Sequence, residues 1–99
     1  MAVYFDNSAT TQVDADVLDA MLPYFTEKYG NASSIHSFGS EAFTAIVKSR
    51  KQVADLLNAS PREVIFTSGG TESDNIAIQG TAFYYKNKKN RIITSVIEH

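Results

Sequence analysis

Residues 67–75 read Thr67-Ser68-Gly69-Gly70-Thr71-Glu72-Ser73-Asp74-Asn75 and separate an apolar run from a helical pattern. The apolar run predicts a strand over 63–67, and the apolar spacing that follows predicts a helix over about 72–86. Gly69 and Gly70 can adopt backbone angles closed to other residues and let a ligand approach the main chain. A helix that starts here presents unpaired N–H groups and the positive end of its dipole. The stretch therefore predicts a strand–turn–helix unit that can hold an anion such as phosphate.

A plain strand-to-helix turn without a ligand fits the same spacing. Thr71 can cap the helix while Asp74 reaches back as in a capping box. A phosphate site requires the carboxylates of Glu72 and Asp74 to turn outward, because they would otherwise repel the anion. No Lys follows the glycines and G-x-G-x-x-G is absent, so neither a P-loop nor a dinucleotide fingerprint is matched. These residues alone leave the phosphate site and the plain turn both open.

A second apolar run follows the helical pattern. Residues 91–95 are nearly all apolar and predict a strand buried on both faces. Strand, helix and strand at this distance predict a βαβ unit with parallel strands and a right-handed crossover. Because sheets usually have about five or six strands, the unit belongs to a larger sheet. The chain ends just past this strand, at residues 96–99, so we expect an incomplete domain.

The first 60 residues predict helices and loops after one short β-prone run at 3–5. Asp14 can cap a helix over about 15–29, which Pro23 should kink or break. A polar loop over 30–37 precedes a helix over about 39–57, which ends at residues 58–61. The buried stripe predicted for that helix consists of Ala42, Ala45, Ile46, Val53, Leu56 and Leu57. The fold class is therefore predicted as α/β.

Composition contributes mainly exclusions. The net charge is −2, and the only basic cluster, at residues 86–91, reads as a solvated loop, so no nucleic-acid surface is indicated. No Cys and only two His are present, which argues against disulfides and against Zn sites built on Cys and His. The N-terminus lacks signal-peptide features, and no apolar run approaches the ~18 residues of a membrane span. We therefore expect a cytoplasmic protein that does not enter a membrane.

Four blocks of sequence resemble NifS/IscS-type cysteine desulfurases. These enzymes belong to the class V aminotransferase superfamily of fold-type I pyridoxal 5'-phosphate (PLP) enzymes. The blocks occur in the family's order and at its distances, and they cover nearly the whole chain. They are residues 4–11 (Tyr-Phe-Asp-Asn-Ser-Ala-Thr-Thr), 30–39 (Gly-Asn-Ala-Ser-Ser-Ile-His-Ser-Phe-Gly), 66–80 around the glycine turn, and 96–99 (Val-Ile-Glu-His).

The resemblance implies a partial PLP-transferase fold type I, with N-terminal helices and one βαβ unit of a larger, mainly parallel sheet. It implies that residues 1–13 are the N-terminal segment of a small domain, and that 14–99 begin a large PLP-binding domain. By this likeness Gly70 and Thr71 would hold the cofactor phosphate. His99 would stack on the pyridine ring and move protons, although by spacing alone it is an ordinary polar residue at a strand end.

Two further assignments follow from the same blocks. The loop from Asn7 to Thr11 would approach the substrate side of the site. His36 would lie near the site entrance or a dimer contact. Ala32 departs from the family pattern, which has Pro there, and this loosens the loop without removing a chemical group.

The implied activity is conversion of L-cysteine to L-alanine, with the sulfur kept as an enzyme persulfide. The implied partners are a second copy of the chain in a homodimer and sulfur acceptors of iron–sulfur cluster assembly or tRNA thiolation. The family's Schiff-base Lys, its pyridine-pairing Asp and its nucleophilic Cys have no counterpart in these 99 residues. The chain alone is therefore predicted to be inactive. Two alternatives stay open: part of another class V enzyme, such as a selenocysteine lyase or an aminotransferase, or a free-standing non-catalytic phosphate-binding module.

Overall fold

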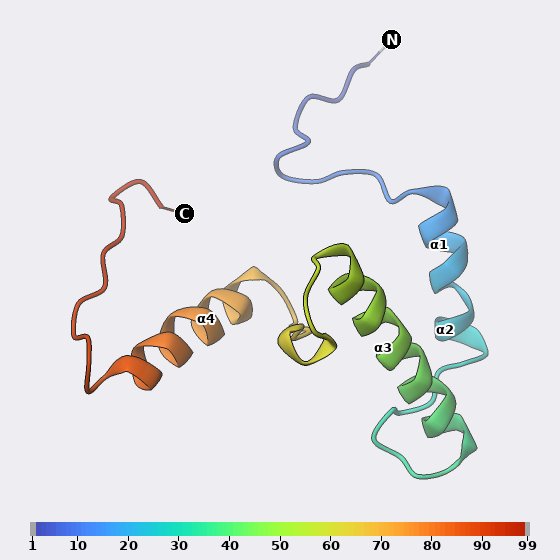
Figure 1. The fold of residues 1–99 in the computed structure, drawn as a ribbon. Coiled ribbons are helices and arrows are strands. Elements are labelled where there is room, and N and C mark those ends of the chain that lie inside the picture. The colour runs from blue at the N-terminus through green and yellow to red at the C-terminus, as the bar shows by residue number, and fades with distance from the viewer. Residues whose placement is uncertain (1, 99) are drawn as a thin grey trace. The chain divides into compact units, whose positions relative to one another are not determined.

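The computed structural model describes residues 2–98, and helices are the regular structure found there (Figure 1). Backbone contacts divide the chain into two units, Met1–Val64 and Ile65–His99. The first unit holds α1 (Ala15–Met21), α2 (Pro23–Thr26), α3 (Ser37–Leu56) and the 3-10 helix η1 (Pro61–Glu63), and the second holds α4 (Gly70–Tyr85).

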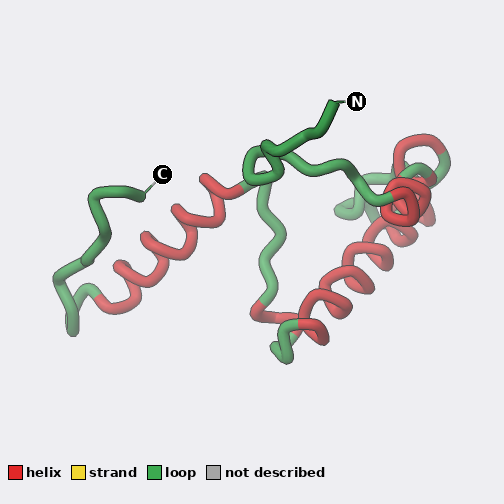
Figure 2. Tube along the Cα trace, turned by 90° about the horizontal axis from the view of Figure 1, so that it is seen from above, coloured by secondary structure: helices red, strands yellow, loops and turns green. Residues whose placement is uncertain are grey.

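The three predicted strands do not form within residues 2–98, where Figure 2 shows only helices and loops. The segments at 3–5, 64–67 and 91–95 are irregular, so the sheet and its βαβ unit are not confirmed. A strand is held by a neighbouring strand that pairs its N–H and C=O groups. No such neighbour lies beside them among the described residues, and Ile65 and Ile93 remain 63% and 87% exposed. The apolar pattern predicted strands, but the pairing that a strand needs comes from segments distant in the sequence.

The break predicted at Pro23 is confirmed. Asp14 caps α1, because its Oδ1 accepts a hydrogen bond from the N–H of Asp16 at 2.9 Å. Pro23 then occupies the first turn of α2, where its missing N–H is harmless. The helical pattern stops at Thr26, three residues before the predicted end at Tyr29.

The long helix α3 begins two residues before the predicted start. His36 is its N-cap, and its Nδ1 accepts a hydrogen bond from the N–H of Gly39 at 3.3 Å. The helix ends just before Asn58, whose φ of 51° lies in the left-handed region that Asn tolerates. η1 packs against α3, and Arg50 donates a hydrogen bond to the carbonyl of Val64.

The predicted buried stripe of α3 is confirmed only in part, since Ala42 is buried and Ala45 and Val53 are half-buried, but the three larger side chains Ile46, Leu56 and Leu57 are exposed. Ala42 and Ala54 are 9% and 0% exposed, whereas Leu56 is 84% exposed and Leu57 66%. The stripe was predicted from spacing, which gives the face of a helix but not what covers that face. In residues 2–98, the buried residues are Gly39, Ala42 and Ala54, which are all small and all belong to α3.

Close backbone contacts make Gly39 a sensitive position in the first unit. A methyl group there would lie 2.1 Å from the carbonyl oxygen of Ser34 and 2.7 Å from that of Asn31. We expect Gly39→Ala to lower the free energy of unfolding by about 1–3 kcal/mol, since the backbone of the loop has to move. Thermal unfolding followed by circular dichroism at 222 nm measures the change.

The matched control is Gly80→Ala, within α4. A methyl group at Gly80 meets no atom within 4 Å. Because Ala is the better helix former, this variant is expected to be more stable by about 0.5–1 kcal/mol. Equal effects of the two substitutions would contradict the close packing at Gly39.

Candidate functional site

The first backbone N–H groups of α4 have no hydrogen-bond acceptor among the described residues. Its N-cap is Gly69, and none of the side chains within residues 2–98 caps this end. The first helical hydrogen bond runs from the N–H of Ser73 to the carbonyl of Gly69, at 3.1 Å. The N–H groups of Gly70, Thr71 and Glu72 therefore lie ahead of the helical ladder, at the positive end of the helix dipole.

The two glycines contribute space rather than unusual angles. Gly69 has φ 164° and ψ −175°, which is extended backbone, and Gly70 is already the first residue of α4. The freedom of both glycines to adopt angles closed to other residues is therefore not used here. A side-chain carbon at either position would meet no atom of the described residues within 4 Å, so the turn is open on that side. A ligand can approach the main chain here because no side chain stands in its way.

The carboxylate of Glu72 is bound to Ser68 instead of pointing freely at the open donors. Its Oε2 accepts hydrogen bonds from the Ser68 N–H at 2.6 Å and from the Ser68 Oγ at 2.7 Å. The backbone N–H first, and the hydroxyl second, stabilise the charged form and lower the pKa of Glu72 below its usual value. Asp74 makes no such bond among the described residues, and the capping box predicted from Thr71 and Asp74 does not form.

The hydroxyl groups of Thr67 and Ser73 make a second set of contacts that holds the turn. The Oγ1 of Thr67 and the Oγ of Ser73 are 2.7 Å apart. Each also donates to the carbonyl of Gly69, Thr67 at 3.2 Å and Ser73 at 3.1 Å. The turn is therefore connected by side chains on both sides of the glycine pair.

This donor set fits a phosphate group. Consecutive N–H groups at a helix start are a general anion site. The Thr71 hydroxyl lies on the same turn and has no partner among the described residues, and Gly70 leaves room for approach. No group of three His, Cys, Asp or Glu side chains that could hold a metal ion occurs within residues 2–98.

The other predicted site residues lie elsewhere. Gly70 and Thr71 are the first two residues of α4, while His99 falls outside the described residues. His36 belongs to the first unit, where it caps α3. Asp6 accepts backbone hydrogen bonds from Ala9 and Thr10 at 3.1 and 3.3 Å, so the segment from Asn7 onward forms a turn.

Sequence reasoning missed the role of Glu72. The available signal was its position as the third residue of α4, from which a glutamate commonly reaches back to the turn before a helix. Spacing alone indicated only that the charge of Glu72 must be kept away from an anion. It did not identify Ser68 as the partner that binds the carboxylate.

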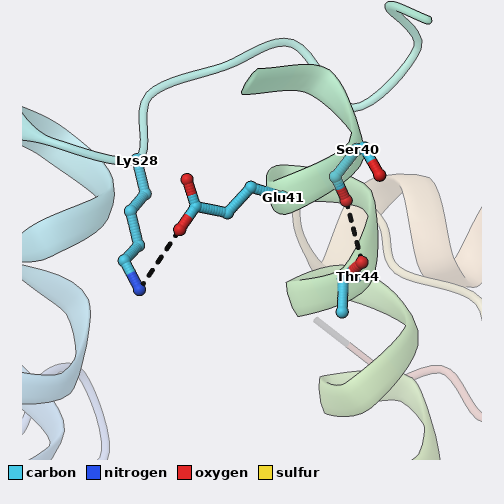
Figure 3. A network of polar contacts seen from close by, with 4 residues as sticks. All are labelled: Lys28, Ser40, Glu41 and Thr44. Atoms are coloured by element: carbon cyan, nitrogen blue, oxygen red, sulfur yellow. Dashed lines mark hydrogen bonds and ion pairs between the residues drawn. The ribbon is translucent and has the colours of Figure 1, made fainter. Parts of the chain in front are cut away.

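Each unit also has a groove lined by residues outside the turn at 67–73. One of about 530 Å³ runs along the start of α3, beside an ion pair between Lys28 Nζ and Glu41 Oε1 at 3.4 Å (Figure 3). On the same helix Thr44 donates to the carbonyl of Ser40 at 2.8 Å. The other groove, of about 610 Å³, lies in the second unit and is lined by Ala77, Ile78, Thr81, Ala82, Tyr85, Lys86, Lys89, Asn90, Arg91 and Ile92.

The basic cluster at residues 86–91 is exposed, as predicted. It follows the end of α4, where the N–H groups of Lys88 and Lys89 donate to the carbonyl of Tyr85 at 2.7 and 2.8 Å. The Lys89 ammonium lies 5.6 Å from the centre of the Tyr85 ring. None of the helices within residues 2–98 combines the length and apolar character needed to cross a membrane.

Known proteins resemble this chain along its length. Residues 3–99 match the family described as Aminotransferase class-V. A protein named cysteine desulfurase IscS from Rickettsia massiliae (strain Mtu5) is 55% identical over 100 residues, which cover 100% of this chain and 24% of that protein. A protein of the same name from Methanosarcina thermophila is 57% identical over 98 residues, covering 99% of this chain and 24% of that protein.

A solved structure described as a NifS-like protein superposes with a TM-score of 0.90 and is 47% identical, covering 100% of this chain and 27% of that one. The chain spans about a quarter of the length of the curated relatives it matches. The resemblance seen in the four sequence blocks is confirmed, and this chain belongs to the class-V aminotransferase family.

Proposed function

We propose that this chain is the N-terminal part of a PLP-dependent cysteine desulfurase, which converts L-cysteine to L-alanine and retains the sulfur as an enzyme persulfide. Identities of 55% and 57% to proteins named cysteine desulfurase IscS support this activity. The observation that carries the proposal is the open start of α4, where unpaired N–H groups and the Thr71 hydroxyl surround a turn without side chains at Gly69 and Gly70.

Within the proposed enzyme, the residues of the turn have separate tasks. The N–H groups of Gly70 and Thr71, with the Thr71 hydroxyl, would hold the PLP phosphate, which fixes the position of the ring. His99 would stack on the ring and hold or move a proton beside it. PLP itself supplies an electron sink for carbanion chemistry when bound.

The finer architecture belongs to the same proposal. Residues 1–13 would belong to a small domain and 14–99 to the start of a large PLP-binding domain. The segments at 63–67 and 91–95 would become strands of a mainly parallel sheet once neighbouring strands pair with them. The N-terminal helices and one βαβ unit would then form part of a PLP-transferase fold of type I.

The proposed partners follow from the activity. The enzyme would act in the cytoplasm as a homodimer. It would pass sulfur to a scaffold of iron–sulfur cluster assembly or to proteins of tRNA thiolation. The Lys that anchors PLP and the Cys that accepts the sulfur would come from the rest of the protein, since this sequence offers no Cys.

Alanine release from L-cysteine, together with persulfide formation, tests the proposal in the full-length protein. We expect turnover by the full-length protein and none by the 99-residue chain. Thr71→Val keeps the shape and the N–H but removes the hydroxyl, so PLP affinity should fall about tenfold, as for loss of a hydrogen bond to a charged group. His99→Ala should reduce alanine release more than it reduces PLP affinity.

Two outcomes would count against the proposal. Release of alanine from selenocysteine but not from cysteine would favour a selenocysteine lyase of the same family. Unchanged PLP affinity in Thr71→Val would mean that the start of α4 does not hold the phosphate.

A further inference from the structure

Glu72 and Ser68 form a contact across the phosphate-type turn, which we call the Ser68–Glu72 brace. We propose that Glu72 is a positioning residue, whose brace to Ser68 keeps the N–H groups at the start of α4 open and oriented for the phosphate of PLP. The inference rests on the proposed function, and it adds a residue that never touches the cofactor.

The geometry of the brace connects the two ends of the turn. One carboxylate oxygen, Oε2, receives both the N–H of Ser68 at 2.6 Å and its Oγ at 2.7 Å. Hydrogen bonds to a charged acceptor are roughly twice as strong as neutral ones. The residues between the bonded pair are Gly69, Gly70 and Thr71, so the brace spans the segment that carries the open donors.

A second set of side-chain contacts also restrains the backbone of this turn. The hydroxyls of Thr67 and Ser73 are 2.7 Å apart, and both donate to the carbonyl of Gly69. This places one connection just outside the other, with the glycine pair inside both. Two glycines without such connections would sample many backbone angles, and ordering them on binding would oppose affinity.

The position of the Glu72 carboxylate also keeps it from occupying the N–H groups that would bind the phosphate. A glutamate at the third position of a helix commonly accepts a hydrogen bond from the N-cap N–H. Here the N-cap is Gly69, and Glu72 reaches one residue further, to Ser68. The Gly69 N–H keeps no acceptor among the described residues, and a negative charge is held on the Ser68 side of the turn. The brace therefore removes a competitor for the phosphate as well as ordering the loop.

The charge on Glu72 makes the brace dependent on pH. The Ser68 N–H and hydroxyl lower the pKa of Glu72. A group whose pKa is lowered by folding contributes its stabilisation above its unfolded pKa and loses it as the pH falls through the folded pKa. Asp74 is the other charged group in the first two turns of α4, and no charged side chain from another element contacts Glu72 among the described residues of this unit.

Titration of the full-length apoenzyme with PLP tests the brace. Glu72→Ala is expected to weaken PLP binding about tenfold, because the loop loses its charge-assisted bonds. Glu72→Gln keeps an acceptor oxygen and should recover part of that loss. Asp74→Asn is the matched control: it removes the same charge two residues further along α4 without breaking a bond, and should change the affinity less than twofold.

The pH profile separates a positioning role from a general structural one. The affinity difference between wild type and Glu72→Gln should be largest near neutral pH and should close as the pH falls through the pKa of Glu72. The phosphate's own titration, with a pKa near ~6, affects both proteins equally and cancels in the ratio. The ³¹P resonance of bound PLP, followed over the same pH range, reports the phosphate environment directly.

The Ser68→Ala variant keeps the test decisive if Glu72→Ala folds poorly. It removes one of the two bonds, should weaken PLP binding to a smaller extent, and should cause no further loss when combined with Glu72→Ala.

Wild-type affinity in Glu72→Ala alongside weakened binding in Thr71→Val would overturn the brace and leave the proposed function standing. Equal losses in Asp74→Asn and Glu72→Ala would also overturn it, since the start of α4 would then need negative charge in general and not the bonds to Ser68. Unchanged binding in Thr71→Val would instead reject the phosphate site itself.

Discussion

Replacing Gly70 with Asp is expected to weaken PLP binding by the full-length protein about a hundredfold or more. Gly70 is the first residue of α4, and no atom lies within 4 Å of the point where its side chain would begin. A carboxylate there would occupy the space that the phosphate needs. It would also place a negative charge beside the phosphate, which itself carries nearly two negative charges. Equilibrium titration with PLP, with inorganic phosphate as a competitor, measures the loss.

Gly80→Asp is the matched control for this substitution. It adds the same charge to the same helix, ten residues and therefore about 15 Å further along the axis. That distance exceeds the ~8 Å Debye length at physiological ionic strength, so the PLP affinity should be unchanged. If both substitutions weaken binding equally, damage to α4 explains the loss and the start of the helix is not the phosphate site.

The segments at 64–67 and 91–95 are expected to exchange their amide hydrogens at least about a thousandfold more slowly in the full-length protein than in the 99-residue chain. In the structure these segments form no strand, and Ile92 and Ile93 are 65% and 87% exposed. Pairing with neighbouring strands would bury them and raise the free energy of opening toward that of global unfolding. Hydrogen exchange followed by mass spectrometry or by NMR gives both rates.

The amides of α3 supply an internal control. Ala54 of α3 is already fully buried in the structure, and the backbone hydrogen bonds of α3 form without any strand beside it. Exchange in the middle of α3 should therefore slow much less than exchange at 91–95. Similar exchange at 91–95 in both proteins would show that this segment is not a sheet strand, and the proposed α/β architecture would then fail.

Local signals in the sequence predicted the helices well. Asp14 caps α1 and Pro23 separates α1 from α2, and both act on backbone groups only a few residues away. The start of α4 was placed within two residues, because the glycine pair marks the turn whatever surrounds it. The strands and the buried stripe of α3 were predicted less well, since both depend on a distant segment that pairs with the backbone or covers the face.

For the candidate site, too, the sequence predicted some features and the structure decided others. The spacing in residues 67–75 predicted a strand-to-helix turn that could hold an anion, and the family resemblance pointed to Gly70 and Thr71 within it. It left open whether a capping box between Thr71 and Asp74 would close the turn instead. The structure shows that the carboxylate of Glu72 binds Ser68, so the helix start stays uncapped. Several acceptors lay within reach of the same donors, and only the backbone path decides among them.

The sequence by itself determined the family, the helices and the turn from Thr67 to Ser73, because these follow from residue types and from contacts between near neighbours. Only the tertiary structure decided that the glycines provide space rather than special angles, and that Glu72 is bound to Ser68. It also decided which apolar side chains are covered. Burial and hydrogen-bond partners depend on where the backbone runs in space, and the order of residues along the chain does not specify that alone.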